Sequence, residues 1–323
     1  MYAGSPKTLW VRGTPLCEFL DVMVEHIRTY HNGATDFTMT FQGFTYRAHR
    51  SRTKMGEQIN LRRIPTECPR LTDLALPPMW APVLTHPSLQ SGGLVIFAAE
   101  TGQGKSTTAA AMIRSRLEKF GGYAWTVEDP AELPLDGAYG SGVCRQSSVE
   151  WDHPDPKESG WAGALRAAMR SFPTTRGNIL FVGEVRDGET AAELIQAAIN
   201  GLLVITTVHA LSIPAAVQRL ISLANRRLDQ IAADLLASAL RVVVTQQLTL
   251  RPDLTGWKRG ELDGKLVYCD GESHPIAVAI RERKFQQILQ SVRYQETVLK
   301  LAGTRQQSVT EVLKDLGSMP GAR

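Results

Sequence analysis

The sequence lacks several features that mark common classes of protein. No apolar run approaches the ~20 residues that a membrane-spanning helix needs, and the N-terminal segment Met1–Trp10 has no apolar core of the kind found in secretory signals. We therefore expect no integral membrane segment. Only four cysteines occur, and none forms a CxxC pair, so the sequence predicts neither a zinc site nor a disulfide framework. This cysteine usage favours a reducing, cytoplasmic setting.

A strong charge of one sign is also missing. The chain has 36 basic and 32 acidic residues, and aromatic residues make up 7% of it. A groove for single-stranded nucleic acid combines a basic surface with aromatic side chains, and here the basic residues are scattered, apart from Arg226–Arg227 and Arg281–Lys284. The sequence therefore argues against direct nucleic-acid binding. Its 323 residues are enough for two modest domains or one large one.

The first 83 residues predict a small α+β domain. Apolar residues at helical spacing favour a helix over Cys17–Tyr30. The alternating stretches Asp36–Phe41 and Phe44–His49 flank Gln42-Gly43, which is typical of a hairpin. A further strand is expected over Gln58–Ile64, and the prolines that follow indicate a linker at 84–91.

From residue 92 the pattern changes to α/β. A continuous apolar strand, Leu94–Ala98, precedes a glycine-rich loop and a helix that continues to about Phe120. The alternation of strands and helices predicts a parallel sheet with crossover helices over 92–265, followed by a helical C-terminal part over 266–323. The other expected elements are strands over Tyr123–Val127, Ile179–Gly183 and Leu202–Val208, and helices over Thr190–Asn200, Leu228–Leu248 and parts of Glu272–Leu316.

The segment AETGQGKS, Ala99–Ser106, has the spacing of a phosphate-binding loop and the required strand before it and helix after it. Backbone N–H groups would surround a phosphate at the helix N-terminus. Lys105 would reach the β- and γ-phosphates, and the Ser106 hydroxyl would bind Mg²⁺. The alternative is a glycine-rich turn with a surface lysine. The residues expected to contact nucleotide in this region are Ala99, Glu100, Thr101, Gly102, Gln103, Gly104, Lys105, Ser106 and Thr107.

Carboxylates follow two of the predicted strands. Glu184 ends the apolar run ILFVGE and is our candidate for polarising the attacking water. The pair Glu128-Asp129 follows another strand and would reach the metal or its water shell, because parallel strands end at one edge of a sheet. A strand-end glutamate facing solvent and a polar turn before a proline are the alternatives. His209 follows a third strand and is either a γ-phosphate sensor or a simple surface group.

These motifs resemble the type II and type IV secretion system ATPases, and the resemblance covers nearly the whole chain. The pilus-retraction (PilT-like) branch and the Dot/Icm or IncI-type conjugation branch look most similar. The blocks that carry the resemblance occur in the family's order and are the phosphate-binding loop Ala99–Thr108, VEDPAE at Val127–Glu132, ALRAAMRSFP at Ala164–Pro173, ILFVGEVRDGET at Ile179–Thr190 and TTVHALS at Thr206–Ser212, with INLRRIP at Ile59–Pro65 upstream.

The resemblance implies a RecA-like P-loop core between a PAS-like N-terminal domain and a helical C-terminal cap. It also implies a homohexameric ATPase that uses ATP and Mg²⁺, with inner-membrane platform or secretion-channel proteins as partners, at the inner face of the bacterial cytoplasmic membrane. By position, the residues with catalytic roles are Glu184, Lys105, Glu128, His209, Arg166 and Arg170. Arg62 matches an arginine near the nucleotide, and Asp129 and Ser106 match the metal site. For each arginine the alternative is an ordinary surface charge.

Three positions depart from the family pattern. Leu202 replaces the family's first histidine, Ala99 replaces a glycine and Glu100 replaces a neutral residue. These departures leave a second hypothesis open, in which the chain is a weakly hydrolysing regulatory subunit of such a machine. A third hypothesis is a RecA-like DNA translocase, which the scattered basic residues do not favour.

Overall fold

The computed structural model describes residues 15–31, 33–54, 56–149, 155, 159–175, 177–249, 251–253, 256–258 and 262–317. It divides the chain into two compact units. The first comprises Met1–Glu67 and Leu250–Lys258, and the second comprises Cys68–Thr249 and Arg259–Arg323. The division after Glu67 lies upstream of the linker that the prolines suggested at 84–91.

The described part of the first unit contains helix α1 (Pro15–Tyr30) and an antiparallel sheet in the order β1-β2-β3. These strands span Asp36–Phe41, Phe44–Thr53 and Gly56–Ile64. Gln42 and Gly43 both have positive φ (47° and 77°), as a two-residue hairpin turn requires. Met23 and Ile27 of the helix are buried in one cluster with Met39 and Phe41 of the sheet. The predicted helix and hairpin are thus confirmed. The short hairpin of β11 (Arg251–Asp253) and β12 (Gly256–Lys258) groups with this unit.

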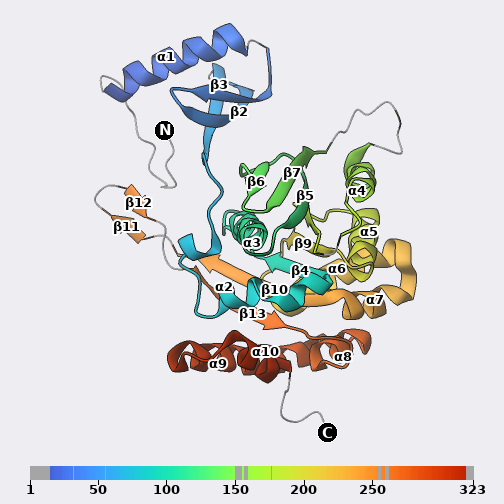
Figure 1. The fold of residues 1–323 in the computed structure, drawn as a ribbon. Helices are drawn as coiled ribbons and strands as arrows, with labels where there is room; N and C mark the ends of the chain where they lie inside the picture. Colours follow the sequence, from blue (N-terminus) through green and yellow to red (C-terminus); the bar gives the residue numbers. More distant parts are fainter. Residues whose placement is uncertain are drawn as a thin grey trace. The chain divides into compact units, whose positions relative to one another are not determined.

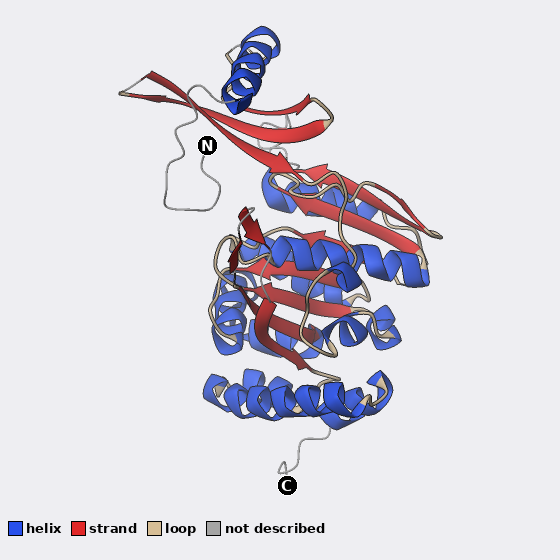
Figure 2. Cartoon of the chain, turned by 90° about the vertical axis from the view of Figure 1, so that its left-hand side faces the viewer, coloured by secondary structure: helices blue, strands red, loops and turns tan. Residues whose placement is uncertain are grey.

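The second unit is built on an eight-stranded sheet in the order β13-β10-β4-β9-β8-β5-β7-β6 (Figures 1 and 2). The strands from β10 to β7 in this order run parallel, and the two outer strands β13 and β6 are antiparallel to their neighbours. The bounds are β4 Gly93–Ala98, β5 Gly122–Glu128, β6 Gly137–Tyr139, β7 Gly142–Ser148, β8 Ile179–Val182, β9 Leu203–Val208, β10 Leu240–Leu248 and β13 Leu262–Tyr268.

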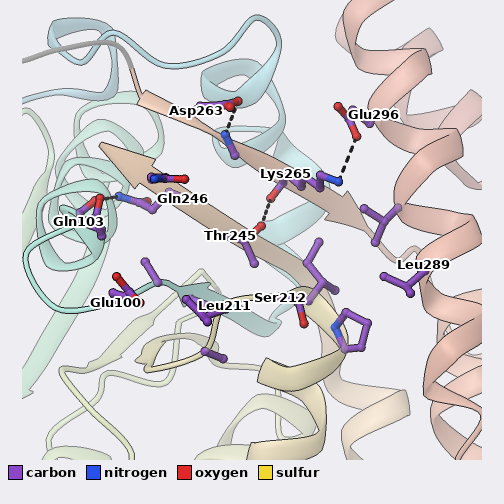
Figure 3. Close-up of a pocket in the computed structure, with 18 of the residues that line it drawn as sticks. Glu100, Gln103, Leu211, Ser212, Thr245, Gln246, Asp263, Lys265, Leu289 and Glu296 are labelled. Carbon is purple, nitrogen blue, oxygen red and sulfur yellow. Dashed lines mark hydrogen bonds and ion pairs between the residues drawn. The ribbon is translucent and has the colours of Figure 1, made fainter. Parts of the chain in front are cut away.

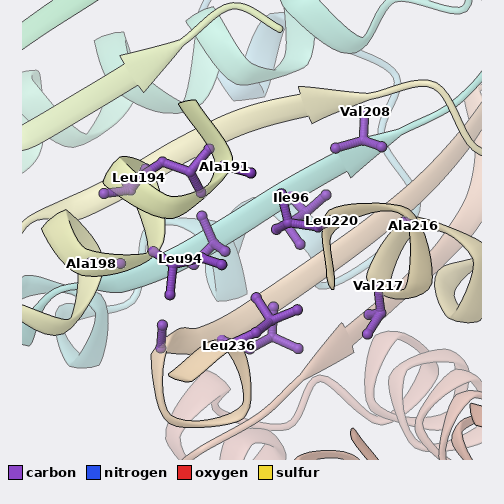
Figure 4. Packing of buried hydrophobic residues seen from close by; sticks show 14 of the residues in the cluster. Leu94, Ile96, Ala191, Leu194, Ala198, Val208, Ala216, Val217, Leu220 and Leu236 are labelled. Atoms are coloured by element: carbon purple, nitrogen blue, oxygen red, sulfur yellow. The ribbon is translucent and has the colours of Figure 1, made fainter. Parts of the chain in front are cut away.

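Helices cover both faces of this sheet, which explains why β4 is apolar at every position. Leu94 and Ile96 belong to one buried cluster, and Val95 and Phe97 belong to another. Figure 4 shows the first cluster, where Leu94 and Ile96 lie near Leu194, Leu220 and Leu236. Helices α4 (Gly160–Arg170), α5 (Gly188–Ile199), α6 (Ile213–Leu228) and α7 (Ala232–Ala239) contribute to that cluster, and α3 (Lys105–Phe120) contributes to the other.

Three C-terminal helices lie along the β13 edge in Figure 1: α8 (Pro275–Arg281), α9 (Phe285–Arg305) and α10 (Val309–Gly317). They confirm the helical tail that the apolar spacing predicted. None of the helices in the described ranges is long and apolar enough to cross a bilayer.

One sequence prediction is wrong. We expected a single helix over Leu228–Leu248, but α6 ends at Leu228, α7 ends at Ala239 and the chain then forms strand β10. Val242, Val243 and Val244 are fully buried between β4 and β13. β-Branched side chains suit a buried strand, so tertiary packing decides the conformation of this apolar run.

The segment 84–91, which was expected to be a linker, forms regular structure within the second unit. Two turns of 3₁₀ helix, η1 (Leu71–Asp73) and η2 (Pro87–Ser91), flank helix α2 (Trp80–Leu84). Arg116 of α3 donates hydrogen bonds to the carbonyl oxygens of Leu84 and His86, at 3.1 Å each. These contacts satisfy acceptors that a helix end leaves without partners, so the segment docks on α3.

A buried histidine joins the C-terminal helices. His274 is 2% exposed and precedes α8; its Nδ1 accepts a hydrogen bond from the Ile276 N–H at 3.1 Å, and its Nε2 lies 3.1 Å from the carbonyl oxygen of Leu316. Since Nδ1 is an acceptor, Nε2 carries the proton and the ring is neutral. Burial lowers the pKa of His274, while the Leu316 carbonyl and the charge of Asp270 act in the opposite direction.

We expect this histidine to make the protein less stable in mild acid. The unfolded chain takes up a proton near pH 6.5, whereas the folded chain resists protonation until a lower pH. Stability is therefore fully present above pH ~6.5 and is lost as pH falls toward the folded pKa, with a slope of at most about 1.4 kcal/mol per pH unit. Urea unfolding between pH 5 and 8 measures this slope. The His274→Asn variant keeps a side-chain acceptor for the helix and should have a shallower slope; equal slopes would contradict the assignment.

Candidate functional site

The loop between β4 and α3 has the conformation of an anion-binding turn. Gly102 and Gly104 have φ values of 80° and 82°, which L-residues with side chains rarely adopt. Gly104 is the N-cap of α3 and supplies no side-chain acceptor to the first turn of the helix. The N–H groups at this helix start can therefore be directed at a phosphate.

Lys105 lies inside this loop. Its side chain is bent back so that Nζ donates hydrogen bonds to the carbonyl oxygens of Ala99 (3.0 Å) and Glu100 (2.8 Å). The residue is 7% exposed, and burial lowers its pKa, while the negative charges of Glu184 and Glu132 act in the opposite direction. The ammonium group thus occupies the loop and bonds to neutral oxygens, which a more negative ligand can replace.

A pair of hydrogen bonds fastens the loop to strand β10. The carbonyl oxygen of Gln103 accepts a hydrogen bond from Nε2 of Gln246 at 2.7 Å, and the side-chain Oε1 of Gln103 accepts one from the Leu248 N–H at 2.6 Å. Figure 3 shows Gln103 and Gln246 directed toward one another. Gln246 is 5% exposed. The sequence did not identify it, because this stretch was expected to be helical.

Glu184 follows β8, and its carboxylate contacts the side chains of Arg186 and His209. Nε and Nη2 of Arg186 are each 2.9 Å from Oε2 of Glu184, and Nε2 of His209 is 3.5 Å from Oε1. Burial and the nearby Lys105 lower the pKa of His209, against the effect of Glu184. The imidazole is therefore neutral at pH 7. Lys105 opens the helix that follows β4, and Glu184 and His209 follow β8 and β9, so the three lie at one edge of the sheet, as the sequence predicted.

Glu128 is held more tightly than expected. Oε1 of its carboxylate accepts hydrogen bonds from Thr126 (2.8 Å) and Gln146 (2.9 Å), and the residue is 5% exposed. Burial raises the pKa of Glu128, and these two hydrogen bonds act against the rise. Asp129, by contrast, is exposed. Of the two, Asp129 is the carboxylate that solvent and a hydrated metal ion reach more easily.

The three arginines expected near the nucleotide lie on α4 and β3, which are not the elements that position Lys105 and Glu184. Arg166 of α4 forms an ion pair with Glu189 at the start of α5, at 3.2 Å, and Arg227 contacts the same carboxylate. Arg170 is exposed at the end of α4. Arg62 is on β3, in the first unit.

The donor set suits Mg²⁺ bound together with a nucleotide better than a metal held by protein side chains alone. Within the described part of the chain, no cluster of three or more His, Cys, Asp or Glu side chains could hold a metal ion. Mg²⁺ is commonly held by one or two protein oxygens, phosphate and water. Ser106 in the first turn of α3 and the exposed Asp129 offer that number of ligands.

A cavity of about 490 Å³ lies on the β10 side of the loop. Figure 3 shows Glu100 and Gln103 on one side of it, Lys265 and Glu296 on another, and Leu211 and Ser212 after β9 below. Lys265 and Glu296 form an ion pair at 3.6 Å. The loop is thus accessible from this side as well as from the side of Glu184.

The parallel sheet, the glycine-rich loop that opens a helix and the acid on a nearby strand define a P-loop nucleotide-binding protein. Residues 31–305 match the model of the type II/IV secretion system protein family. The chain belongs to this family.

Individual relatives agree with this assignment. The chain is 30% identical over 223 residues to the uncharacterized protein YggR of Escherichia coli, covering 67% of this chain but 62% of that protein. It is 32% identical over 274 residues to the type IV pilus ATPase PilU of Pseudomonas aeruginosa, covering 79% and 67%. A crystal structure of the pilus retraction motor PilT with bound ADP superposes with a TM-score of 0.65 at 27% identity, covering 93% and 80% of the two chains. The fold is therefore RecA-like, as predicted, with a small N-terminal domain and C-terminal helices.

Proposed function

We propose that this chain hydrolyses ATP as one subunit of a hexameric ring and thereby powers a type IV pilus, type IV secretion or conjugation machine. The observation that carries the proposal is the convergence of Lys105 and Glu184 at the glycine-rich loop, close enough for the negative charge of Glu184 to act on Lys105. Membership of the secretion family and the likeness to a pilus motor that binds ADP support it.

The residues suggest a division of roles. A bound nucleoside triphosphate with Mg²⁺ supplies the phosphoanhydride bond and an electrophilic phosphorus. Lys105 exchanges its bonds with the Ala99 and Glu100 carbonyls for bonds to phosphate oxygens, where its charge counts most as negative charge shifts in the transition state. Glu184 orients the attacking water and accepts its proton. The neutral imidazole of His209 lies beside the Glu184 carboxylate.

The remaining residues would complete the charge balance. Ser106 and Asp129 would hold Mg²⁺, directly or through water, and Arg166, Arg170 and Arg62 would neutralise phosphate charge in the assembled ring. Thr101, Gly102, Gln103, Gly104 and Thr107 would line the phosphate. The partners would be inner-membrane platform or secretion-channel proteins, with the ring in the cytoplasm at the inner face of the membrane.

A regulatory subunit that binds ATP and turns it over slowly is the second candidate. It is favoured by Glu100, an exposed acid in the phosphate-binding loop, because a negative charge there opposes the binding of polyphosphate. The two candidates predict the same assembly and differ in turnover.

We expect the purified chain to form particles of about six times its 35.5 kDa mass when ATP is present, and to release phosphate continuously. Mass photometry and a coupled phosphate assay on the same sample measure both properties. Hexamers without phosphate release would favour the regulatory subunit. A monomer at all nucleotide concentrations would contradict the ring. DNA-stimulated turnover that salt abolishes would favour the translocase.

A further inference from the structure

Arg186 has no role in the proposed function, yet it makes the strongest contact with Glu184. Its guanidinium presents Nε and Nη2 to the same carboxylate oxygen, Oε2, each at 2.9 Å. A charge-assisted hydrogen bond of this kind is stronger than one between neutral groups. The side chain of Arg186 is 56% exposed, and that of Glu184 is 22% exposed. The pair is therefore open to ligands from solvent.

This contact opposes the chemistry expected of Glu184. A carboxylate that orients a water must offer a lone pair to it and accept its proton. In the structure Oε2 accepts a hydrogen bond from Nε of Arg186 and lies 2.9 Å from Nη2, and the other oxygen, Oε1, faces His209 at 3.5 Å. As long as Arg186 remains in place, Oε2 of Glu184 is not available to an attacking water.

A bound phosphate would be a more favourable partner for Arg186 than the Glu184 carboxylate. Guanidinium binds phosphate by the same two-point geometry as carboxylate, and a terminal phosphate carries more negative charge than Glu184. The charge of Asp129 also acts on Arg186 and raises its pKa together with Glu184. The guanidinium thus remains charged beside two carboxylates, those of Glu184 and Asp129.

We propose that Arg186 is a latch on Glu184, which exchanges the carboxylate for the terminal phosphate of a bound nucleoside triphosphate and so frees Glu184 only when ATP is present. Arg186 is then a positioning residue for hydrolysis and a source of preference for ATP over ADP. This inference depends on the proposed function, because it requires that ATP bind at this loop. It adds a control step in which Arg186 occupies the Glu184 carboxylate until ATP binds.

The test is a set of four proteins: wild type, Arg186→Gln, Glu184→Gln and the double variant. Isothermal calorimetry measures their affinities for ATP and ADP, a readout independent of turnover. Glu184→Gln removes the charge that holds Arg186, so ATP should bind more tightly to this variant than to wild type. With Arg186→Gln also present, this gain should largely disappear, and the preference for ATP over ADP should fall by at least about tenfold.

The outcomes separate the latch from a purely electrostatic effect of Glu184. If Glu184→Gln tightens ATP binding equally with and without Arg186, simple relief of repulsion between carboxylate and phosphate accounts for the gain and the latch is wrong. If no variant and no wild-type protein binds ATP, the proposed function itself fails. Arg186→Lys keeps the positive charge but cannot present two N–H groups together as a guanidinium does, so this variant should retain part of the preference for ATP over ADP. Arg281→Gln removes an arginine from a different ion pair, with Glu272 at 3.2 Å, and should behave as wild type.

Discussion

Glu184→Gln should lower the steady-state turnover of ATP by about 10²–10⁴-fold, the usual contribution of a general base. The amide has nearly the same shape as the carboxylate but cannot accept the proton of the attacking water. Because the proton is transferred only in the transition state, the loss should appear in kcat and not as weaker ATP binding. Phosphate release and nucleotide affinity, measured on the same preparations, test both parts.

The matched control is Glu272→Gln, which changes a glutamate far along the chain that is 69% exposed and pairs with Arg281. We expect its turnover to equal that of wild type. Unchanged turnover in Glu184→Gln, with ATP still bound, would make the regulatory subunit the better description. Weaker binding with unchanged turnover would instead assign Glu184 a structural role, and Glu128 would become the next candidate for the base.

Lys105→Ala should abolish measurable turnover and weaken nucleotide binding as well. Lys105 differs from Glu184 because its charge attracts phosphate in both the ground state and the transition state. Loss of one such donor typically costs about 10²–10³-fold in kcat, and a charged hydrogen bond is worth about 1.5–3 kcal/mol in binding. Phosphate release and ADP affinity measure the two effects.

Lys314→Ala provides the comparison, since Lys314 is an exposed residue of α10 and should be silent. The Lys105 ammonium donates its hydrogen bonds to backbone oxygens of its own loop, so we expect the variant to fold. Wild-type phosphate release from a folded Lys105→Ala protein would mean that catalysis occurs at another site.

The sequence predicted the core of the second unit because local signals and tertiary packing agree there. The apolar strand before the loop, the glycine-rich turn and the helix that follows it are all as expected. Lys105, Glu184 and His209 meet because strands of a parallel sheet end at one edge. The catalytic and binding roles of these residues stay predictions until variants are measured.

The sequence failed where an apolar run had no period of its own. Periodicity does not separate a buried helix from a buried strand in Leu228–Leu248, and the β-branched stretch Val242–Val244 is the local sign of strand β10. The same error hid Gln246, whose contact with Gln103 requires the strand. Arg186 was visible within GEVRDGET, but its pairing with Glu184 depends on side-chain geometry that spacing does not reveal.

The two hydrogen bonds between Gln103 and β10 have a mechanical consequence. The polypeptide continues from Leu248 into the β11–β12 hairpin, which belongs to the first unit. Tension along this stretch of chain acts on Leu248 and, through its N–H, on the loop that would grip phosphate. Coupling of this kind is reciprocal. A displacement of the end of β10 would weaken phosphate binding by the loop, and bound phosphate would in turn hold the end of β10 in place.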